Sequence, residues 1–241
     1  MGEQRNWKRI RERFSLKLPI QVHCKETNEF AWTEASRLIN VTPFGAGFNL
    51  KHPTEKGRLL HMVIPMPRQL RVFDHLELQY RIWAIVRHAK LVDVPNSNES
   101  LFQVGVAFIG KRPPATYDKE PWRRYDIVEG PRKLTNVIEM LSPLKPVDQR
   151  SITRHNIAVD LKLETLDDNG NTLKSETTVT EDISKQGARI YTTLDPQVGR
   201  FIRLISSQYN LTVFAAVRGV SKGEDGIKRI HVEFIGSEWP L

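Results

Sequence analysis

The sequence has little cysteine and no long hydrophobic run. Cys24 is the only cysteine among the 241 residues, which excludes an intrachain disulfide and a zinc site built on cysteines, and is typical of a reducing cytoplasm. The longest apolar runs, such as Ile82 to Val86 and Val213 to Val217, are far shorter than the roughly 20 residues that a membrane-spanning helix needs. The N-terminal residues are charged throughout and lack the apolar core of a signal peptide. We therefore expect a cytoplasmic protein without a membrane span.

The sequence also lacks the usual signatures of an enzyme. Its seven histidines are scattered without metal-ligand spacing, and it contains neither a nucleophile elbow nor a phosphate-binding loop. Glu26, Glu29 and Glu34 form a small acidic group, for which a solvated strand or loop face is the favoured interpretation. We expect no catalytic residues, no metal site and no cofactor.

Basic residues are abundant by contrast. Lys and Arg number 36 against 28 Asp and Glu, giving a net charge of +8 and an isoelectric point near 9.6. Such a balance favours an anionic partner such as nucleic acid, a nucleotide or an acidic lipid, although solubility explains part of it. The length permits one large domain or two of ordinary size.

One motif occurs twice and divides the chain into two related units. Asp182-Ile183-Ser184-Lys185-Gln186-Gly187 repeats near the N-terminus as Asn40-Val41-Thr42-Pro43-Phe44-Gly45. The final glycines lie 142 residues apart (187 − 45), and the same offset aligns Gly57 with Gly199. Later matches need smaller offsets, so the first unit carries extra residues around Pro65 to Gln79 and in the loop 96–100. The sequence therefore predicts one structural unit written twice.

Short segments rich in β-branched and aromatic residues, separated by turn signals, make up most of each unit. In the second unit the predicted strands are Ile157 to Leu163, Arg189 to Thr193, Phe201 to Ser206, Leu211 to Arg218 and Arg229 to Phe234. Asn169-Gly170 is typical of a type I′ hairpin turn. About six antiparallel strands in about 100 residues favour a small barrel, which leaves no sheet edge exposed. We expect a mainly β protein with barrels at residues 1–112 and 147–241.

The connector, residues 113–146, is bounded by proline clusters. Within it, Pro131 could open a helix whose apolar residues recur at helical spacing: Leu134, Val137, Ile138 and Leu141. We expect this α-helical segment to lie across the first barrel or the domain interface, and a helix that binds a partner protein is the alternative. Trp122 and Tyr125 are expected to join that contact.

A pair of arginines spaced by four precedes each copy of the motif. The pairs are Arg9 with Arg13 and Arg150 with Arg154, and the second arginine precedes its motif by 27 and 28 residues (40 − 13 and 182 − 154). Like charges held together favour an anionic ligand such as a bis-phosphate, and a guanidinium can grip phosphate or a guanine edge and also stack on a base. A single such pair is more simply a solvated basic face. Two copies at matched distances favour a site.

The repeated motif itself is typical of a tight turn. An Asp or Asn followed by Ser or Thr forms a turn capped by its own side chains, and the glycine gives the backbone freedom that few residues have. That turn alone would explain the motif. Beside two arginines, however, its carboxylate or amide could accept hydrogen bonds from the N1-H and N2-H of guanine.

These motifs together resemble the PilZ domain family: Arg-x-x-x-Arg, then about 30 residues, then Asp/Asn-x-Ser-x-x-Gly, and finally a strand like Gly-Val-x-Phe. The resemblance covers residues 5–112 and 147–237. It implies a six-stranded antiparallel barrel that binds the bacterial second messenger cyclic di-GMP. By this resemblance the ligand-binding residues are Arg150, Arg154, Asp182, Ser184 and Gly187 in the second unit, and Arg9, Arg13, Asn40, Thr42 and Gly45 in the first.

The first unit departs from the family pattern at Thr42, where serine is usual. Threonine keeps the hydroxyl but stiffens the side chain, so weaker binding is expected and loss of binding is not.

The family's arginine segment often wraps the ligand, which makes Pro143 to Gln149 a natural hinge for changing the relation of the domains. The downstream partner that would receive the signal is not identified by the sequence.

Two other functions remain open. Small basic barrels can bind single-stranded nucleic acid through stacked aromatic residues, but Phe108 and Phe234 alternate with apolar neighbours as core residues do. Trp7 and Trp122 lie outside the repeat. A protein-interaction adaptor without nucleotide affinity is the other alternative.

Overall fold

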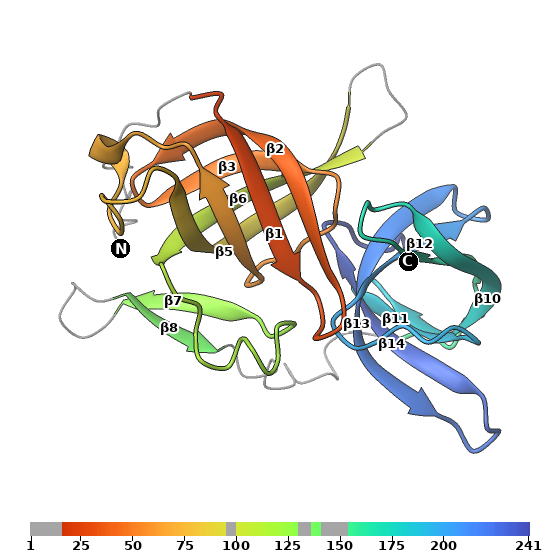
Figure 1. Ribbon diagram of the computed structural model, residues 1–241. Helices are drawn as coiled ribbons and strands as arrows, with labels where there is room; N and C mark the ends of the chain where they lie inside the picture. Colours follow the sequence, from red (N-terminus) through yellow and green to blue (C-terminus); the bar gives the residue numbers. More distant parts are fainter. Residues whose placement is uncertain (1–15, 95–99, 130–135, 141–153) are drawn as a thin grey trace, which may run out of the picture.

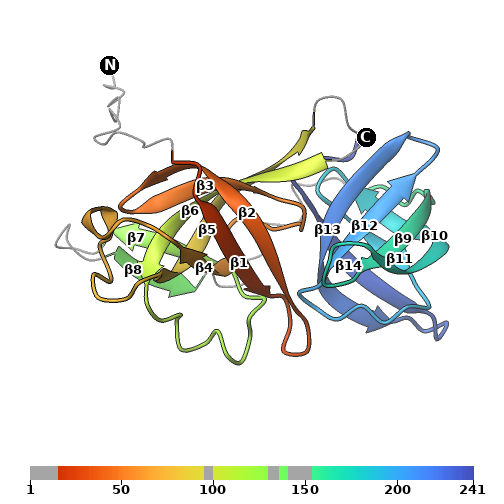
Figure 2. The same ribbon diagram turned by 45° about the horizontal axis from the view of Figure 1, so that its top comes forward.

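Two β-barrels lie side by side in the computed structural model (Figure 1 and Figure 2), which describes residues 16–94, 100–129, 136–140 and 154–241. Both barrels are closed, and every strand pair found in the described ranges is antiparallel. Across these ranges, no helix has the length and apolar character needed to cross a membrane.

The first barrel closes in the order β1-β2-β3-β6-β5-β4. Its elements are β1 (Pro19–Lys25), β2 (Ala31–Thr42), β3 (Gly45–Leu50), β4 (Leu59–Ile64), the short 3-10 helix η1 (Arg68–Leu70), β5 (Tyr80–Asp93) and β6 (Ser100–Gly110). The extra residues that the repeat alignment placed at Pro65 to Gln79 lie in the β4–β5 connection, which carries η1.

The second barrel closes in the order β10-β11-β14-β13-β12-β9, which is the same cyclic order when each set is numbered from its own first strand. Its strands are β9 (Asp160–Leu166), β10 (Thr172–Ser184), β11 (Gly187–Tyr191), β12 (Phe201–Ser206), β13 (Leu211–Lys222) and β14 (Lys228–Ile235). The prediction of two six-stranded antiparallel barrels is thereby confirmed. The domain boundaries drawn around them remain a prediction.

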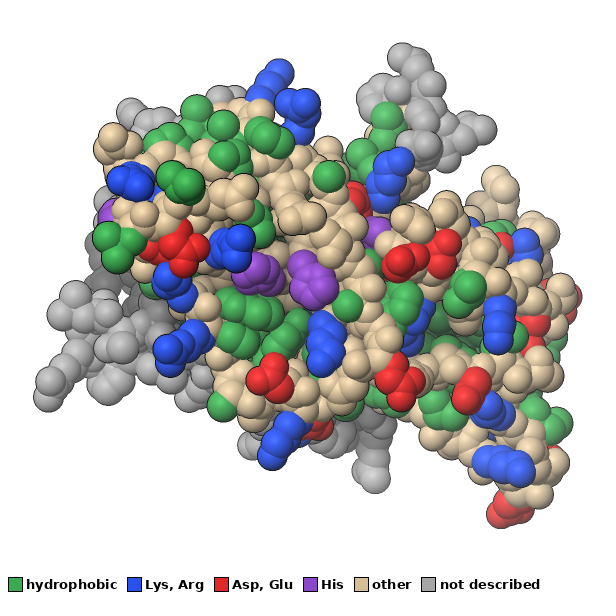
Figure 3. All heavy atoms as spheres, viewed as in Figure 1, with side chains coloured by type: hydrophobic (Ala, Val, Ile, Leu, Met, Phe, Trp, Pro, Cys, Tyr) green, Lys and Arg blue, Asp and Glu red, His purple; other side chains and the backbone are tan. Residues whose placement is uncertain are grey.

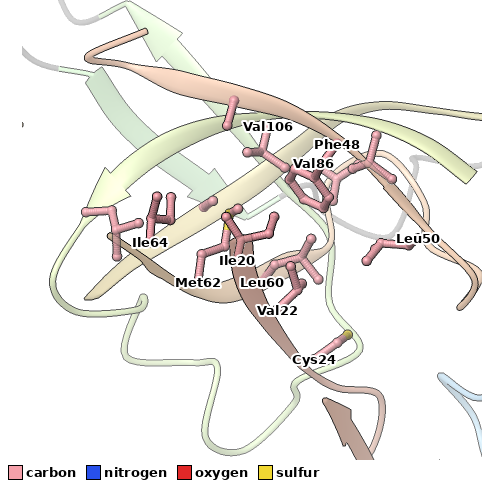
Figure 4. Close-up of a cluster of buried hydrophobic side chains, with 14 of the residues drawn as sticks. Ile20, Val22, Cys24, Phe48, Leu50, Leu60, Met62, Ile64, Val86 and Val106 are labelled. Atoms are coloured by element: carbon pink, nitrogen blue, oxygen red, sulfur yellow. The ribbon is translucent and has the colours of Figure 1, made fainter. Parts of the chain in front are cut away.

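Inward-facing side chains fill each barrel. On β1 every second residue is buried, so Ile20, Val22 and Cys24 point into the core of the first barrel (Figure 4). Burial raises the pKa of the Cys24 thiol to about 12, so this cysteine stays protonated and serves as a small apolar side chain. Phe108 and Phe234 are buried at corresponding places, as predicted.

Bulges interrupt the two barrels at matching positions. The register shifts between Leu38 and Asn40 in β2 and between Thr180 and Asp182 in β10, at the first residue of each motif copy. Because a bulge bends its strand and reorients the side chains beside it, these shifts help to set the direction in which the motif residues point.

The connector differs from its prediction. Its described part contains β7 (Tyr125–Glu129) paired with β8 (Asn136–Met140), and this two-stranded sheet lies beside the first barrel (Figure 1). The helix expected from Pro131 to Leu141 is therefore wrong at 136–140, and its remaining residues lie outside the described ranges. Val137 and Ile138 are β-branched, and a short apolar run cannot be assigned to a helix or a strand until its partner is known. That partner is β7.

Tyr125 and Trp122 do join the contacts of the connector. Tyr125 is buried with Leu59, Ile85 and Tyr117 of the first half of the chain. Trp122 lies against the backbone of Gly199, where an added Cβ would be 2.3 Å from the Cβ of Trp122. The connector thus touches both barrels.

Apolar side chains of the second barrel complete the core of the first. Phe201, Ala216 and Ile235 belong to the hydrophobic cluster of the first barrel. The rings of Phe102 and Phe214 meet edge to face across the boundary, with centroids 5.1 Å apart. The two units are therefore packed against each other by buried hydrophobic surface.

Glu26 lies at the same boundary, which corrects its expected place on a solvated face. It is 3% exposed and accepts hydrogen bonds from the indole of Trp32 (2.9 Å) and the backbone N–H of Phe201 (3.1 Å). The guanidinium of Arg200 lies 3.1 Å from its carboxylate. The sequence around Glu26 could not reveal this burial, because Arg200 and Phe201 are contributed by the other repeat.

Glu55 anchors a second buried ion cluster between the barrels. Its carboxylate lies 2.9 Å from Arg58 and 3.0 Å from Arg218. Burial acts to raise the pKa of Glu55, but Arg218 and Arg58 outweigh that effect and hold the pKa below its usual range. Arg218 also binds Glu233 on β14 at 2.8 Å, so the cluster reaches from the first barrel into the second.

The Asn169-Gly170 turn is longer than predicted. Gly170 has a φ of +79°, whereas Asn169 is not among the described residues with positive φ, so the pair does not form a type I′ turn. The loop is held by the side chain of Asp167, which accepts from the backbone N–H groups of Asn169 (2.9 Å) and Asn171 (2.8 Å). Its role as the β9–β10 hairpin loop is as expected.

Candidate functional site

Both copies of the repeated motif form the same tight turn. In the second barrel the hydroxyl of Ser184 donates to the carbonyl of Gly187 (3.1 Å) and accepts from the N–H of Gln186 (3.4 Å). In the first barrel Thr42 makes the matching bonds to Gly45 (3.3 Å) and Phe44 (3.2 Å). The hydroxyl at this position therefore caps the turn in both barrels, and threonine does so as serine does.

The glycine of each turn is required by a close approach of the neighbouring strand. A Cβ on Gly187 would lie 2.3 Å from the carbonyl oxygen of Val232 on β14, and a Cβ on Gly45 would lie 2.2 Å from that of Val106 on β6. These contacts are with backbone, which cannot move aside. The serine or threonine and the glycine thus have a structural role, whatever they bind.

In the second barrel, Arg154 and Asp182 come together beside the turn. The backbone of His155 exchanges hydrogen bonds of 2.8 and 3.0 Å with Ile183, which holds the segment before β9 against the end of β10. The guanidinium of Arg154 then lies 3.4 Å from the carboxylate of Asp182. Asp182 is 7% exposed, whereas the Arg154 side chain is about half exposed and open to an incoming anion.

Four of the five residues predicted for this site thus lie together: Arg154, Asp182, Ser184 and Gly187. Arg150 lies outside the described residues. In the first barrel Asn40, Thr42 and Gly45 lie together at the β2–β3 turn, and Arg9 and Arg13 lie outside the described residues. His155 is half-buried, and its backbone rather than its ring fixes the position of Arg154.

Sequence reasoning missed a second arginine at the Asp182 carboxylate. Arg189 on β11 lies 3.5 Å from Asp182 and 3.0 Å from Glu181. Arg229 on β14 binds Glu181 from the other side at 2.9 Å. Burial acts to raise the pKa of Glu181, but Arg229 and Arg189 outweigh it and hold the pKa below its usual range. The second site is therefore a network of alternating charges.

The repeat alignment contained a signal for Arg189. At the offset of 142 its counterpart is Gly47 (189 − 142), and the counterpart of Glu181 is Ile39 (181 − 142). The first barrel thus has no charge at two positions where the second has an ion pair. Differences between repeats, rather than their shared motif, indicate these residues.

The first motif lies beside an open cavity of about 390 Å³. A Cβ on Gly47 would lie 3.1 Å from the amide of Asn40, so the Asn40 side chain rests against bare backbone where Arg189 stands in the second barrel. The cavity is lined by residues of β2, the β2–β3 turn, β3, β5 and β6, including Ile39, Asn40, Thr42, Phe44, Arg87, His88 and Gln103.

The motif turn of the second barrel is also connected to the domain boundary. Gly187 pairs across the ladder with Glu233 on β14. Glu233 binds Arg218 (2.8 Å) and Arg124 (3.2 Å), and both arginines also reach Glu55 of the first barrel. One strand pair therefore separates the turn from the ion cluster between the barrels.

The comparison with protein families decides the nature of the second unit. The PilZ domain family model matches residues 148–238. The second barrel is a PilZ domain. The match spans the Arg-x-x-x-Arg pair, the motif turn and all six strands of the barrel. The first barrel shares the strand order and the turn geometry of this PilZ domain, and its membership of the family remains a prediction.

Solved structures with a similar course of the chain include the inhibitor of motility MotI/DgrA of Bacillus subtilis, with 9% identity over 92% of this chain and 88% of that one and a TM-score of 0.29. PlzA of Borreliella burgdorferi in complex with c-di-GMP has 9% identity over 94% of this chain and 84% of that one, with a TM-score of 0.28. YcgR of Escherichia coli in complex with c-di-GMP has 11% identity over 91% of this chain and 76% of that one, with a TM-score of 0.26. At these TM-scores the likeness says nothing about how the barrels of this protein are arranged. A search of the curated proteins found no match.

Proposed function

We propose that this protein is a non-catalytic bacterial receptor for cyclic di-GMP, acting in the cytoplasm. The PilZ domain binds the ligand through Arg150, Arg154, Asp182, Ser184 and Gly187. The first barrel provides a second site through Arg9, Arg13, Asn40, Thr42 and Gly45. The observation that carries the proposal is the meeting of Arg154 and Asp182 beside the motif turn of a PilZ domain.

The chemistry of the ligand fits these two side chains. Cyclic di-GMP carries two phosphodiesters and two guanines. A half-exposed guanidinium can bind a phosphate oxygen pair, and a carboxylate can accept from the N1-H and N2-H of one guanine. Arg154 and Asp182 pair with each other, so binding would exchange one ion pair for two interactions with the ligand.

The signal leaves the site along β14. A ligand that takes Arg154 from Asp182 acts on the turn at Gly187, whose ladder partner Glu233 holds Arg218 and Arg124 at the domain boundary. Repacking of that ion cluster would alter the relation of the two barrels and so the surface offered to a downstream protein. The segment Pro143 to Gln149 stays the predicted hinge. Small-angle scattering that does not change on saturation with cyclic di-GMP would argue against such a rearrangement.

Calorimetry with cyclic di-GMP tests the proposal directly. The wild type is compared with Arg13→Ala and Arg154→Ala, each of which removes one arginine from one site. We expect the wild type to give a binding signal at micromolar concentrations of cyclic di-GMP, and each variant to lose one class of site. Absence of binding by the wild type would refute the proposed function. Loss in only one variant would identify the active site.

Nucleic-acid binding is the alternative that the net charge of +8 favours. The arrangement of charge is against it. On the face shown in Figure 3, Lys and Arg side chains are interspersed with Asp and Glu. Several arginines of the second barrel are engaged by carboxylates, among them Arg189, Arg203, Arg218 and Arg229. Binding to a polyanion would weaken steeply with salt, whereas binding of a dinucleotide with two charges should respond less.

An adaptor without nucleotide affinity is the remaining alternative. It predicts that the proteins bound by this chain are the same with and without cyclic di-GMP. A pull-down from lysate performed at both ligand conditions distinguishes the two, because a receptor should gain or lose a partner on saturation.

A further inference from the structure

Each barrel has a cross-strand pair of one histidine and one glycine beside its motif. In the first barrel His88 on β5 faces Gly105 on β6. In the second barrel the order is reversed, with Gly219 on β13 facing His231 on β14. Both pairs follow the register shift that comes directly after Val86 and Val217. The repeats thus keep one imidazole and one bare position at the same place, but contribute them from opposite strands.

In the first barrel the imidazole forms part of the cavity wall. His88 lines the cavity of about 390 Å³ together with the motif residues Asn40 and Thr42. A Cβ on Gly105 would lie 1.9 Å from the Cε1 atom of His88, so the ring lies directly on the Gly105 backbone. No larger residue at Gly105 would leave the ring where it is. The glycine therefore makes the room that the imidazole occupies.

In the PilZ domain the imidazole lies one side chain away from the motif carboxylate. His231 pairs across the ladder with Arg189, whose guanidinium is 3.5 Å from Asp182. The Nε2 atom of His231 lies 3.0 Å from the hydroxyl of Ser221. A Cβ on Gly219 would be 3.8 Å from the His231 ring, which is an ordinary van der Waals contact, so the ring lies beside Gly219 without depending on its missing side chain.

Burial lowers the pKa of His231, and the positive charges of Arg189 and Arg154 lower it further, against the opposite effect of Asp182 and Glu181. These effects together favour the uncharged form of the ring. An uncharged imidazole is a flat surface with one N–H donor and one acceptor.

We propose that His88 and His231 contact the ligand, each presenting its ring to a guanine held by the neighbouring motif turn. This inference rests on the proposed function and adds two binding residues that the motifs do not contain. A purine can stack on the ring, and its N7 and O6 acceptors can receive the ring N–H. The cavity beside His88 gives a base room to lie against that ring in the first barrel. In the second barrel His231 is only half-buried, so a base can reach its side chain.

Each site is measured alone in the full-length chain. The Arg154→Ala background isolates the first site, and the Asn40→Ala background isolates the second. In calorimetry with cyclic di-GMP, His88→Ala in the first background and His231→Ala in the second should each weaken binding about tenfold, the size of one lost base-stacking contact. His75→Ala, an exposed histidine in the β4–β5 connection, is the matched control and should bind as its background does.

The results separate the two ideas. If the wild type binds and the single-site backgrounds bind, but the histidine variants match their backgrounds, this inference is wrong and the proposed function stands. If the wild type does not bind at all, both fail. A tenfold loss shared by His75→Ala would also overturn the inference, because the effect would then not depend on position.

Two glycine variants test the geometry without altering either histidine. Gly105→Ala should displace the His88 ring and weaken the first site about as much as His88→Ala. Gly219→Ala has room for its methyl group and should change the second site little. The double variant His88→Ala/Gly105→Ala should bind like His88→Ala alone, because no ring is left to displace. Independent, multiplying losses in the double variant would contradict a shared mechanism.

Discussion

The two motif sites share one backbone and differ in what surrounds it. The turn, its hydroxyl cap and its crowded glycine are the same in both barrels. Around the turn, however, the PilZ domain places Glu181 and Arg189 where the first barrel has Ile39 and Gly47. The second site is filled by ion pairs, and the first is an open cavity. The fold therefore accounts for the repeated motif, and the residues around it determine what each site can bind.

Because their surroundings differ, the two sites also differ in the interactions that a ligand would have to displace in order to bind. Under the proposed function, cyclic di-GMP at the second site would replace Arg154 and Arg189 as partners of Asp182 and would bind the two guanidiniums in return. At the first site Asn40 is uncharged, and the cavity is already open. A charged, pre-paired site favours selectivity for an anion, whereas an open neutral site depends more on contact with the bases.

The largest expected effect tests whether the buried ion cluster around Glu55 holds the two barrels together. Glu55→Gln removes the carboxylate that Arg58 and Arg218 share at the buried boundary and leaves Arg218 with Glu233 alone, so it should lower the free energy of unfolding by about 3 kcal/mol. Chemical denaturation measures it. Glu26→Gln at the same boundary is the control and should cost about 1 kcal/mol, since burial raises the pKa of Glu26 despite Arg200 and so disfavours its charged form, whereas the pKa of Glu55 is lowered. Equal losses in the two variants would contradict this ranking.

The same two glutamates predict opposite responses to pH. The folded-state pKa of Glu55 is lowered, so its stabilisation is present above the ordinary pKa of a glutamate and is lost as pH falls through the folded value. The folded-state pKa of Glu26 is raised, so its contribution is present at low pH and is lost as pH rises through the folded value. Unfolding curves from about pH 6 to pH 3 should therefore show a smaller acid loss in Glu55→Gln than in the wild type. A steeper loss in the variant would reverse the assignment.

The next effect separates the charged site from the neutral one. Asp182→Ala removes the acceptor, takes away the carboxylate beside Arg154 and leaves Arg189 with Glu181 alone, so binding at the second site should weaken about a hundredfold. Calorimetry in the Asn40→Ala background gives the value. Lys185→Ala, an exposed residue of the same turn, should leave the affinity unchanged. A comparable loss in Lys185→Ala would mean that the turn as a whole, rather than the carboxylate, is responsible.

A smaller effect converts one site toward the other. Asn40→Asp gives the first barrel the carboxylate of the second, and a charged acceptor makes the stronger bonds to the N–H donors of guanine. In the Arg154→Ala background we expect binding about threefold to tenfold tighter. Weaker binding would show that the open site cannot hold a charge without a counterpart of Arg189.

The smallest effect concerns the departure from the family pattern. Thr42 makes the same two hydrogen bonds as Ser184, so Thr42→Ser should change the affinity of the first site by less than about twofold. Thr42→Ala removes the cap and should lower the midpoint of thermal unfolding instead. A large gain in affinity from Thr42→Ser would show that the methyl group itself obstructs the ligand.

The sequence was sufficient to predict what both repeats share. Strand alternation and turn residues predicted the barrels, and Phe201–Ser206 is a strand at the predicted bounds. The residues from Asn136 to Met140 could not be assigned correctly because their strand depends on pairing with β7. The sequence analysis missed or misinterpreted Glu26, Glu55 and Arg189 for a related reason. Segments far away in the chain form their environment, so the local sequence pattern cannot predict it.

Cys24 gives this protein a practical advantage in testing the hinge. Because its thiol is fully buried, with a pKa of about 12, it should not react with maleimide or nitroxide reagents under native conditions. A cysteine introduced on the surface of each barrel could then be labelled without removing the natural one. Fluorescence or spin-label distances between the two probes would report directly whether cyclic di-GMP moves one barrel relative to the other, with the native core left intact.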